Sequence, residues 1–175
     1  MEKINRSALL PYTAQEICDN GGPLRYNRHS STIAALFPRS GETTMAHQEL
    51  VSDIESYPEF LPWCTEARVL SREHDEVRAS IGFAVSGLTR SFTTRNYHQV
   101  NKIIEMQLVE GPFSSMHGCW QFDSLGDTGC RISLYIEYDF SSRMLGMVVG
   151  PVFNQIANTL VDSFRQRDVE ISGAR

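Results

Sequence analysis

The chain has 175 residues, 41% of them hydrophobic, and a formal net charge of −5 at pH 7. This length fits one domain with a substantial core, since a domain of about 150 residues buries roughly 68–70% of the surface its unfolded chain exposes. The acidic balance and the scattered basic residues argue against a protein that binds DNA through many phosphates. No apolar run approaches about 18 residues and no secretory signal follows Met1, so we expect one cytoplasmic domain over residues 1–175.

Motifs for catalysis and metal binding are not found in the sequence. The four cysteines form no C-x-x-C pair, so we expect reduced thiols, and the five histidines form no H-E-x-x-H spacing. No G-x-S-x-G elbow or glycine-rich phosphate loop occurs. Glu55 and Glu59 flank an aromatic segment, but acids beside a turn are usually only solvated. The sequence therefore predicts a non-enzymatic protein with no catalytic residue, no metal site and no required cofactor.

The N-terminal region contains two possible helix starts. Alternating apolar residues over 3–10 predict a first strand. Thr13 then resembles an N-cap, with Glu16 as its capping-box partner three residues later. A second N-cap, Thr44, precedes a helix predicted over 45–56. Two helix starts therefore precede one helix body.

Residues 50–64, LVSDIESYPEFLPWC, combine a short amphipathic helix with an aromatic and proline-rich continuation. A proline lacks the N–H that helix continuation requires and clashes with the preceding turn, so a regular helix should end near Pro58. So much apolar surface must cover the core or a cavity. We interpret the segment as a lid whose predicted residues are Tyr57, Pro58, Phe60, Leu61 and Pro62.

Downstream of the lid, alternating apolar residues predict six strands. A change to steps of three and four then predicts one long helix over 145–164, with a kink at Gly150–Pro151. With the first strand this gives an α+β protein of the helix-grip type, in which a curved antiparallel sheet of about seven strands wraps around a long C-terminal helix. The predicted strands are 67–71, 77–85, 92–96, 104–108, 116–122 and 132–140.

A curved sheet over one helix leaves a gap at its open end, where we expect a hydrophobic ligand. Each candidate lining residue would also serve as ordinary core. A polar head group would need a hydrogen-bond donor, for which Arg95, Asn96 or Tyr97 could serve. A cyclase activity would need convergent polar groups in the cavity, which fold likeness does not establish. The predicted cavity residues are Trp63, Phe83, Phe92, Met106, Leu108, Phe113, Trp120, Phe122, Phe153, Ile156 and Leu160.

Five segments in order resemble the START-like, polyketide cyclase/dehydrase-related family of bacterial ribosome association toxins and coenzyme Q-binding proteins. The resemblance implies a helix-grip domain that holds ubiquinone or another polyprenyl quinone without a chemical step and supports respiration, with transient contact at the inner-membrane surface. Its alternative implication is a type II toxin that binds the large ribosomal subunit and blocks subunit joining. The segments are KINRSALLPYTAQEICD (3–19), LVSDIESYPEFLPWC (50–64), FTTRN (92–96), QLVEGPF (107–113) and FNQIANTLVDSF (153–164).

Ribosome binding would require a basic surface. Arg90, Arg95 and Lys102 fall on neighbouring predicted strands, and Arg165 and Arg167 fall near the end of the last helix. These residues could form a local basic patch, although scattered basic residues are more often plain surface.

In the resembled family, Asp19 would be followed directly by Leu50, so residues 20–49 look like an insertion. Our hypothesis is a solvent-exposed loop, followed by a first helix rebuilt with Thr44 as its N-cap. Such a loop is tolerable because loop-closure entropy grows only logarithmically with length. The alternative is that Ile33–Phe37 form a helix of their own against the lid or a partner.

Overall fold

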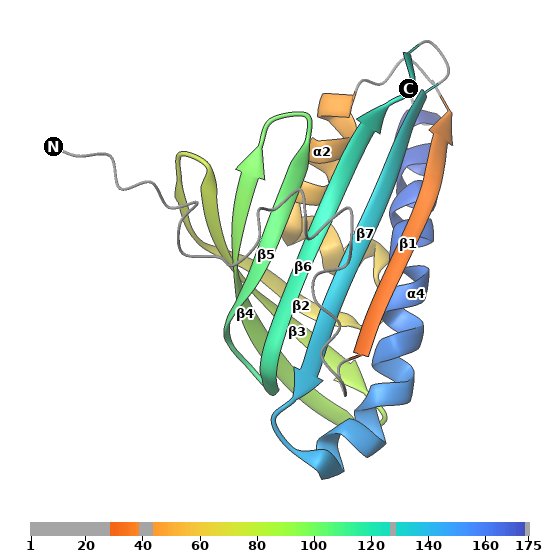
Figure 1. Cartoon of the computed structure of the whole chain (residues 1–175). Coiled ribbons are helices and arrows are strands. Elements are labelled where there is room, and N and C mark those ends of the chain that lie inside the picture. Colours follow the sequence, from red (N-terminus) through yellow and green to blue (C-terminus); the bar gives the residue numbers. More distant parts are fainter. Residues whose placement is uncertain (1–28, 39–43, 127–128, 174–175) are drawn as a thin grey trace, which may run out of the picture.

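The computed structural model describes residues 29–38, 44–126 and 129–173 (Figure 1). Their strands form one seven-stranded sheet in the order β1-β7-β6-β5-β4-β3-β2, with every neighbouring pair antiparallel. The helical elements are α2 (Thr44–Ser52), the 3-10 turn η2 (Ile54–Ser56), α3 (Tyr57–Phe60) and α4 (Arg143–Gly173). The strands are β1 (His29–Pro38), β2 (Cys64–Glu73), β3 (Glu76–Val85), β4 (Leu88–Gln99), β5 (Ile103–Glu110), β6 (Phe113–Ser124) and β7 (Gly129–Phe140).

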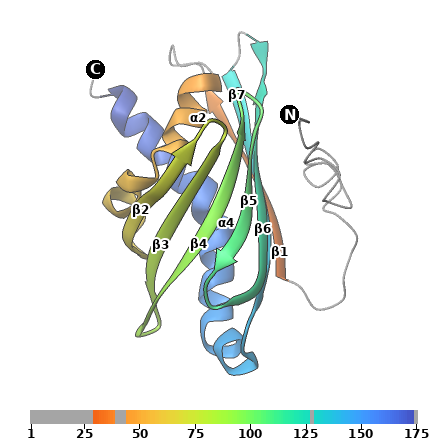
Figure 2. The same cartoon turned by 90° about the vertical axis from the view of Figure 1, so that its left-hand side faces the viewer.

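The sheet curls around α4, as Figure 2 shows from the side. Register shifts in β2, β4 and β6 mark bulges or irregular pairing, which bend a strand and increase its twist. The inner face of α4 carries Val149, Phe153, Val161 and Phe164, each at most 5% exposed. Their spacing is the helical period that the sequence predicts. The expected helix-grip arrangement is confirmed.

Helix α4 is long and apolar enough, by length and composition, to cross a membrane. The core helix of a globular domain meets the same criterion, and the inner face of α4 packs against the sheet. The helix runs through Pro151 as one element from Arg143 to Gly173. The predicted kink at Gly150–Pro151 stays a prediction.

Aromatic rings fill the core where α4 approaches β3, β6 and β7. The ring of Phe153 lies 4.8 Å from Tyr138, 5.2 Å from Phe113 and 6.0 Å from Phe83, measured between centroids. Full burial of one such side chain stabilises the fold by about 1.5–3 kcal/mol. This cluster fixes one half of α4 against the sheet and leaves the other half to border the lid.

Over residues 29–38, the structure corrects the expectation that the 20–49 insertion begins as a solvent-exposed loop. Residues 29–38 form β1, which pairs with β7 along its whole length. Phe37 is 1% exposed and its ring packs 5.0 Å from that of His47. The alternative of a separate helix over Ile33–Phe37 is wrong for the same reason: Ile33, Ala35 and Phe37 pack on the core while the intervening side chains are exposed.

Helix α2 begins at Thr44, the position expected for a rebuilt first helix. It ends at Ser52, earlier than predicted, and η2 and α3 continue the segment. The strand predicted over 3–10 and the helix start at Thr13 lie outside the described residues.

Two of the cysteines, Cys64 and Cys130, are buried free thiols. Cys119 is disulfide-bonded, which corrects the expectation of four reduced thiols. Spacing could not reveal this, because tertiary structure decides which sulfurs meet.

Candidate ligand-binding cavity

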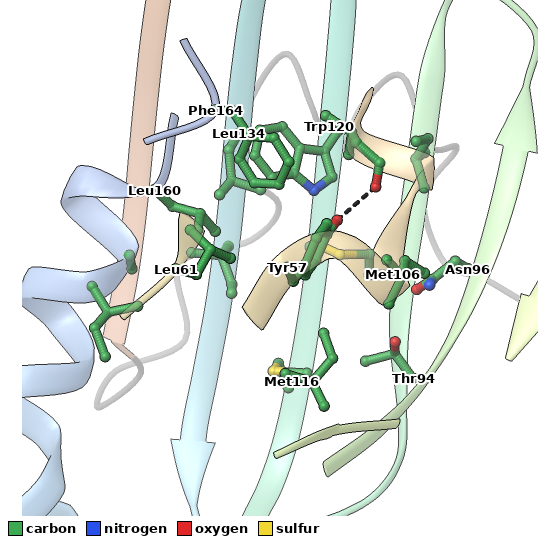
Figure 3. Close-up of a pocket in the computed structure, with 18 of the residues that line it drawn as sticks. Tyr57, Leu61, Thr94, Asn96, Met106, Met116, Trp120, Leu134, Leu160 and Phe164 are labelled. Carbon is green, nitrogen blue, oxygen red and sulfur yellow. Dashed lines mark hydrogen bonds between the residues drawn. The ribbon is translucent and has the colours of Figure 1, made fainter. Parts of the chain in front are cut away.

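A cavity of about 80 Å³ lies between the sheet and α4, beneath the segment from α2 to α3 (Figure 3). Strands β3 to β7 supply its floor and α4 supplies one wall. Its lining is mostly apolar, with polar groups gathered on β4 and α2. The lining residues are Val51, Ser52, Ile54, Tyr57, Leu61, Trp63, Ile81, Phe92, Thr94, Asn96, His98, Ile104, Met106, Met116, Gly118, Trp120, Leu134, Ile136, Phe153, Ile156, Ala157, Leu160 and Phe164.

Tyr57 closes the cavity from the lid side. Its side chain is 8% exposed, its hydroxyl donates a 2.6 Å hydrogen bond to the carbonyl of Val51, and Figure 3 shows this bond beside Trp120. Burial raises the pKa of the Tyr57 phenol, and Cys64 and Asp53 raise it further. The hydroxyl therefore stays protonated and keeps its donor role.

The lid is itself a short helix, which sequence reasoning did not expect. Pro58 sits in the first turn of α3, where a missing N–H leaves no hydrogen bond unmade. The ring of Phe60 packs edge-on against Phe164 with centroids 5.1 Å apart. Arg167 on α4 pairs with Glu59 and lies 5.5 Å from the Phe60 ring centroid. The ion pair between Glu59 and Arg167 therefore connects the lid to α4.

The polar end of the cavity comes from alternate residues of β4. Thr94 and Asn96 are 4% and 5% exposed, and His98 follows on the same face. Figure 3 shows the Asn96 amide directed into the cavity between Met106 and Thr94. Asn96 Oδ1 and His98 Nε2 are buried and have no hydrogen-bond partner in the described part of the chain. We call Thr94, Asn96 and His98 the β4 polar strip.

The other ring nitrogen of His98 is held near α2. His98 Nδ1 lies 3.5 Å from Ser52 Oγ, and that hydroxyl donates to the carbonyl of Gln48 at 2.7 Å. Burial lowers the pKa of His98, Arg72 lowers it further, and Asp75 opposes both. The imidazole is therefore neutral near pH 7.

The lining contains two titratable groups, Tyr57 and His98, and no carboxylate. Both groups are held in their neutral forms, so the cavity presents hydrogen-bonding groups and apolar surface without a charge. No cluster of three or more His, Cys, Asp or Glu side chains that could hold a metal occurs among residues 29–38, 44–126 and 129–173. The arrangement suits a small apolar molecule with one polar end.

The structure brings only part of the predicted cavity set together. Phe83 and Phe113 pack against the ring of Phe153 but do not line the cavity. Phe122 is buried and does not line it either. Leu108 is half-buried against the core, and Pro58, Phe60 and Pro62 do not reach the lining. Those that line the cavity are Trp63, Phe92, Met106, Trp120, Phe153, Ile156, Leu160, Tyr57 and Leu61.

Of the three expected head-group contacts, only Asn96 reaches the cavity. Arg95 and Tyr97 lie on the other face of β4, because successive strand residues point to opposite faces. Arg95 Nη1 donates to the Tyr97 hydroxyl at 3.4 Å and Arg95 Nε pairs with Glu76 at 3.2 Å. Thr94 and His98 were not among the expected head-group contacts, although both share the parity of Asn96 and period-two counting could have found them.

The expected basic patch does not form. Arg90 lies near the start of β4, and Lys102 lies in the turn that follows its end at Gln99. At about 3.3 Å per residue, the stretch from Arg90 to Gln99 separates them by about 30 Å. Arg165 pairs with Asp162 at 3.5 Å, and Arg167 is engaged by the lid. The charged groups of this surface are therefore mostly matched locally.

A curved antiparallel sheet, a long C-terminal helix and an apolar cavity between them define the START-like class of helix-grip domains. Solved structures share this fold: a START superfamily protein from Mycobacterium smegmatis has a TM-score of 0.61 and 18% identity, covering 80% of this chain and 95% of that one. The Zhui aromatase/cyclase from a Streptomyces species has a TM-score of 0.63 and 16% identity, covering 81% and 92%. Identities this low show the fold alone.

Sequence comparison assigns the family. Residues 49–165 match the family described as polyketide cyclase / dehydrase and lipid transport, and the chain belongs to it. Ribosome association toxin RatA of Pseudomonas aeruginosa is 38% identical over 170 residues, 97% of each chain, and that of Escherichia coli K12 is 31% identical over 175 residues, 100% of this chain and 92% of the relative. The coenzyme Q-binding protein COQ10 of Dictyostelium discoideum is 24% identical over 129 residues, 71% of this chain and 63% of the relative.

Proposed function

We propose that this protein binds a small, largely apolar molecule between its sheet and α4, without transforming it. The observation that carries the proposal is the cavity beneath Tyr57, which has apolar walls and one polar strip on β4. A cavity of about 80 Å³ is smaller than the roughly 150 Å³ of an apolar cavity known to take up benzene. Binding of an aromatic ring therefore requires the lid to move Tyr57 aside.

Organic extraction of the natively purified protein, followed by mass spectrometry, tests this proposal. We expect a stoichiometric apolar compound in the wild type and less of it in Ala157→Leu, because Ala157 is 2% exposed and lines the cavity, so a leucine side chain there would take up part of the ligand's space. Met144→Leu, at a site 71% exposed, is the matched control. Equal recovery from a correctly folded Ala157→Leu would contradict binding in the cavity.

A quinone is one candidate for the bound molecule. It is supported by the similarity to a relative named as a coenzyme Q-binding protein, which is limited to 24% identity over 71% of this chain. A polyprenyl tail would have to leave the cavity past the lid, since a cavity of about 80 Å³ is too small for it. Recovery of a polyprenyl quinone in the extract would support this identity.

Ribosome association is the second candidate function, and it is better supported by similarity than quinone binding. The relatives named ribosome association toxin match nearly the whole chain, at 38% and 31% identity. We propose that the protein associates with the large ribosomal subunit. Sedimentation with purified subunits through sucrose gradients should place it with the large subunit; recovery only at the top of the gradient would contradict the proposal.

A further inference from the structure

We propose that the β4 polar strip receives a hydroxyl group of the apolar ligand, so that the cavity prefers a phenol or hydroquinone over the corresponding quinone. This inference rests on the proposed ligand-binding function. It starts from Asn96, whose side chain is 95% buried and whose Oδ1 has no hydrogen-bond partner in the described structure. An amide oxygen buried without a partner destabilises the fold, and a bound hydrogen-bond donor would remove that cost.

The chemistry of the strip decides the class of head group. Asn96 Oδ1 can only accept a hydrogen bond, whereas a quinone carbonyl has no hydrogen to donate. A hydroxyl donates to Oδ1 and can also accept from the Thr94 hydroxyl. His98 Nε2 is a second acceptor, because the single proton of the neutral ring lies on Nδ1, which faces Ser52 Oγ. The neutral state of His98 removes any preference for an anionic ligand, because no cation lines the cavity.

The space for the ring comes from the lid. The phenol ring of Tyr57 is packed between Phe164, 5.3 Å away by centroids, and the sheet side of the cavity. Displacement of that ring would add its own volume to the present cavity of about 80 Å³. The Tyr57 side chain thus serves as a plug that a ligand ring replaces, while the β4 polar strip fixes the ligand hydroxyl.

Binding of durohydroquinone and duroquinone, two probes of equal size, tests the preference. Anaerobic titration, followed by the fluorescence of Trp120 and Trp63 in the lining, should show durohydroquinone binding at least about tenfold more tightly. Asn96→Leu should bring the ratio close to one. Tyr57→Ala, which opens the cavity, should tighten both probes and keep the preference.

The outcomes separate this inference from the proposed function. Equal affinity of the two probes for the wild type and for Tyr57→Ala would overturn the head-group assignment and leave ligand binding standing. No binding of either probe, even to Tyr57→Ala, would overturn both. A preference retained in a folded Asn96→Leu would also overturn the role of Asn96.

The sequence contains two similar segments near its N-terminus. Residues 7–11 read SALLP and residues 34–38 read AALFP; each is followed by a Thr and then a helix start, TAQE at 13–16 and TMAHQE at 44–49. In the structure the second copy supplies the edge strand β1 and the start of α2. Phe37, at the position that corresponds to Leu10, is buried in the core.

The second copy brings polar side chains into the core. His47 and Gln48 are 1% and 7% exposed, and if Asp19 preceded Leu50 directly their places would be taken by Ile17 and Cys18. The buried amide of Gln48 has a hydrogen-bond partner, since its Nε2 donates to the carbonyl of Gln99 at 3.0 Å. Ile17 and Cys18 at these two places would need no such partner. We infer that residues 3–19 and 29–49 can occupy the same place, pairing with β7 and opening α2, so that the domain has two alternative N-terminal halves.

Aspartate substitutions in the full chain, under reducing conditions, test this exchange. If either copy can fill the place, Phe37→Asp and Leu10→Asp should each lower the melting temperature by less than about 5 °C, and the double variant should lose its cooperative transition. Leu36→Asp, at a site 64% exposed on the same strand, is the matched control. A loss in Phe37→Asp alone as large as in the double variant would overturn the inference, as would unfolding by Leu10→Asp alone.

Discussion

The two ends of the cavity differ in whether their buried polar groups make hydrogen bonds within the protein. At the lid end, Tyr57 completes its hydrogen bond with Val51, and the rings of Tyr57, Trp120 and Phe164 pack edge-on. At the sheet end, Asn96 and His98 keep buried atoms without partners in the described structure. The contacts at the lid end stabilise the fold. In the proposed function, the unpaired polar atoms at the sheet end bind the ligand.

The lid end should show the largest effect on stability. Phe164 is 1% exposed and touches the rings of Tyr57, Phe60 and Trp120, so Phe164→Ala should lower the free energy of unfolding by about 3–5 kcal/mol. Urea denaturation measures this loss, with Met144→Ala as a control expected to stay within about 0.5 kcal/mol. A loss below about 1.5 kcal/mol would show that the lid end is not tightly packed.

Removing one hydroxyl at the lid end should have a smaller effect. Tyr57→Phe deletes the 2.6 Å hydrogen bond to the Val51 carbonyl and should lower stability by about 1–2 kcal/mol, because that carbonyl is buried. Tyr97→Phe, on the outer face of β4, removes a hydroxyl that receives a 3.4 Å bond and should change stability far less. Equal losses of stability in the two variants would contradict a larger contribution from the buried hydrogen bond of Tyr57.

At the sheet end, loss of a polar group should change the free energy of unfolding very little. Asn96→Leu removes an oxygen without a partner, so stability should be unchanged or rise by up to about 1 kcal/mol. Gln48→Leu is the matched contrast. Its amide is equally buried but bonds the Gln99 carbonyl and the Asn101 amide, and its loss should cost about 1–3 kcal/mol. Similar losses in both variants would remove the distinction between the two ends.

The smallest expected effect is a pH dependence from His98. Its pKa in the folded protein lies below the unfolded value of about 6.5. Between these two pKa values, the unfolded chain therefore binds more protons than the folded protein. The contribution of neutral His98 to stability is therefore complete above about pH 6.5 and is lost as the pH falls toward the folded pKa. Denaturation between pH 7.5 and pH 5 should show a weaker dependence in His98→Gln; an identical dependence would contradict burial of this ring.

Much of the sheet and the C-terminal helix could be predicted because their apolar periods are uninterrupted. The turn at Gly87 follows from its backbone, since Ser86 and Gly87 adopt φ values of 51° and 78° that suit a tight hairpin. The strand at 29–38 was not predicted, because its apolar alternation lies in a segment rich in Gly, Pro and Arg. Tertiary pairing with β7 outweighed that local composition.

The cavity was harder to predict than the fold. Apolar residues such as Phe83 and Trp120 have the same sequence signature, yet only Trp120 reaches the cavity. Where α4 departs from the sheet is set by packing between distant segments, which no local pattern records. Arg95, Asn96 and Tyr97 were predicted as alternatives, whereas period-two counting along β4 places Asn96 on the inner face and excludes the other two.

The central claim, that a ligand enters between the sheet and α4 beneath Tyr57, is tested most directly by an ¹⁵N–¹H NMR titration with durohydroquinone. The amides of Tyr57, Asn96, His98 and Trp120 should shift together and saturate with one affinity. Shifts confined to outward-facing sites such as Leu36 and Arg90, with those cavity amides unchanged at saturation, would contradict it.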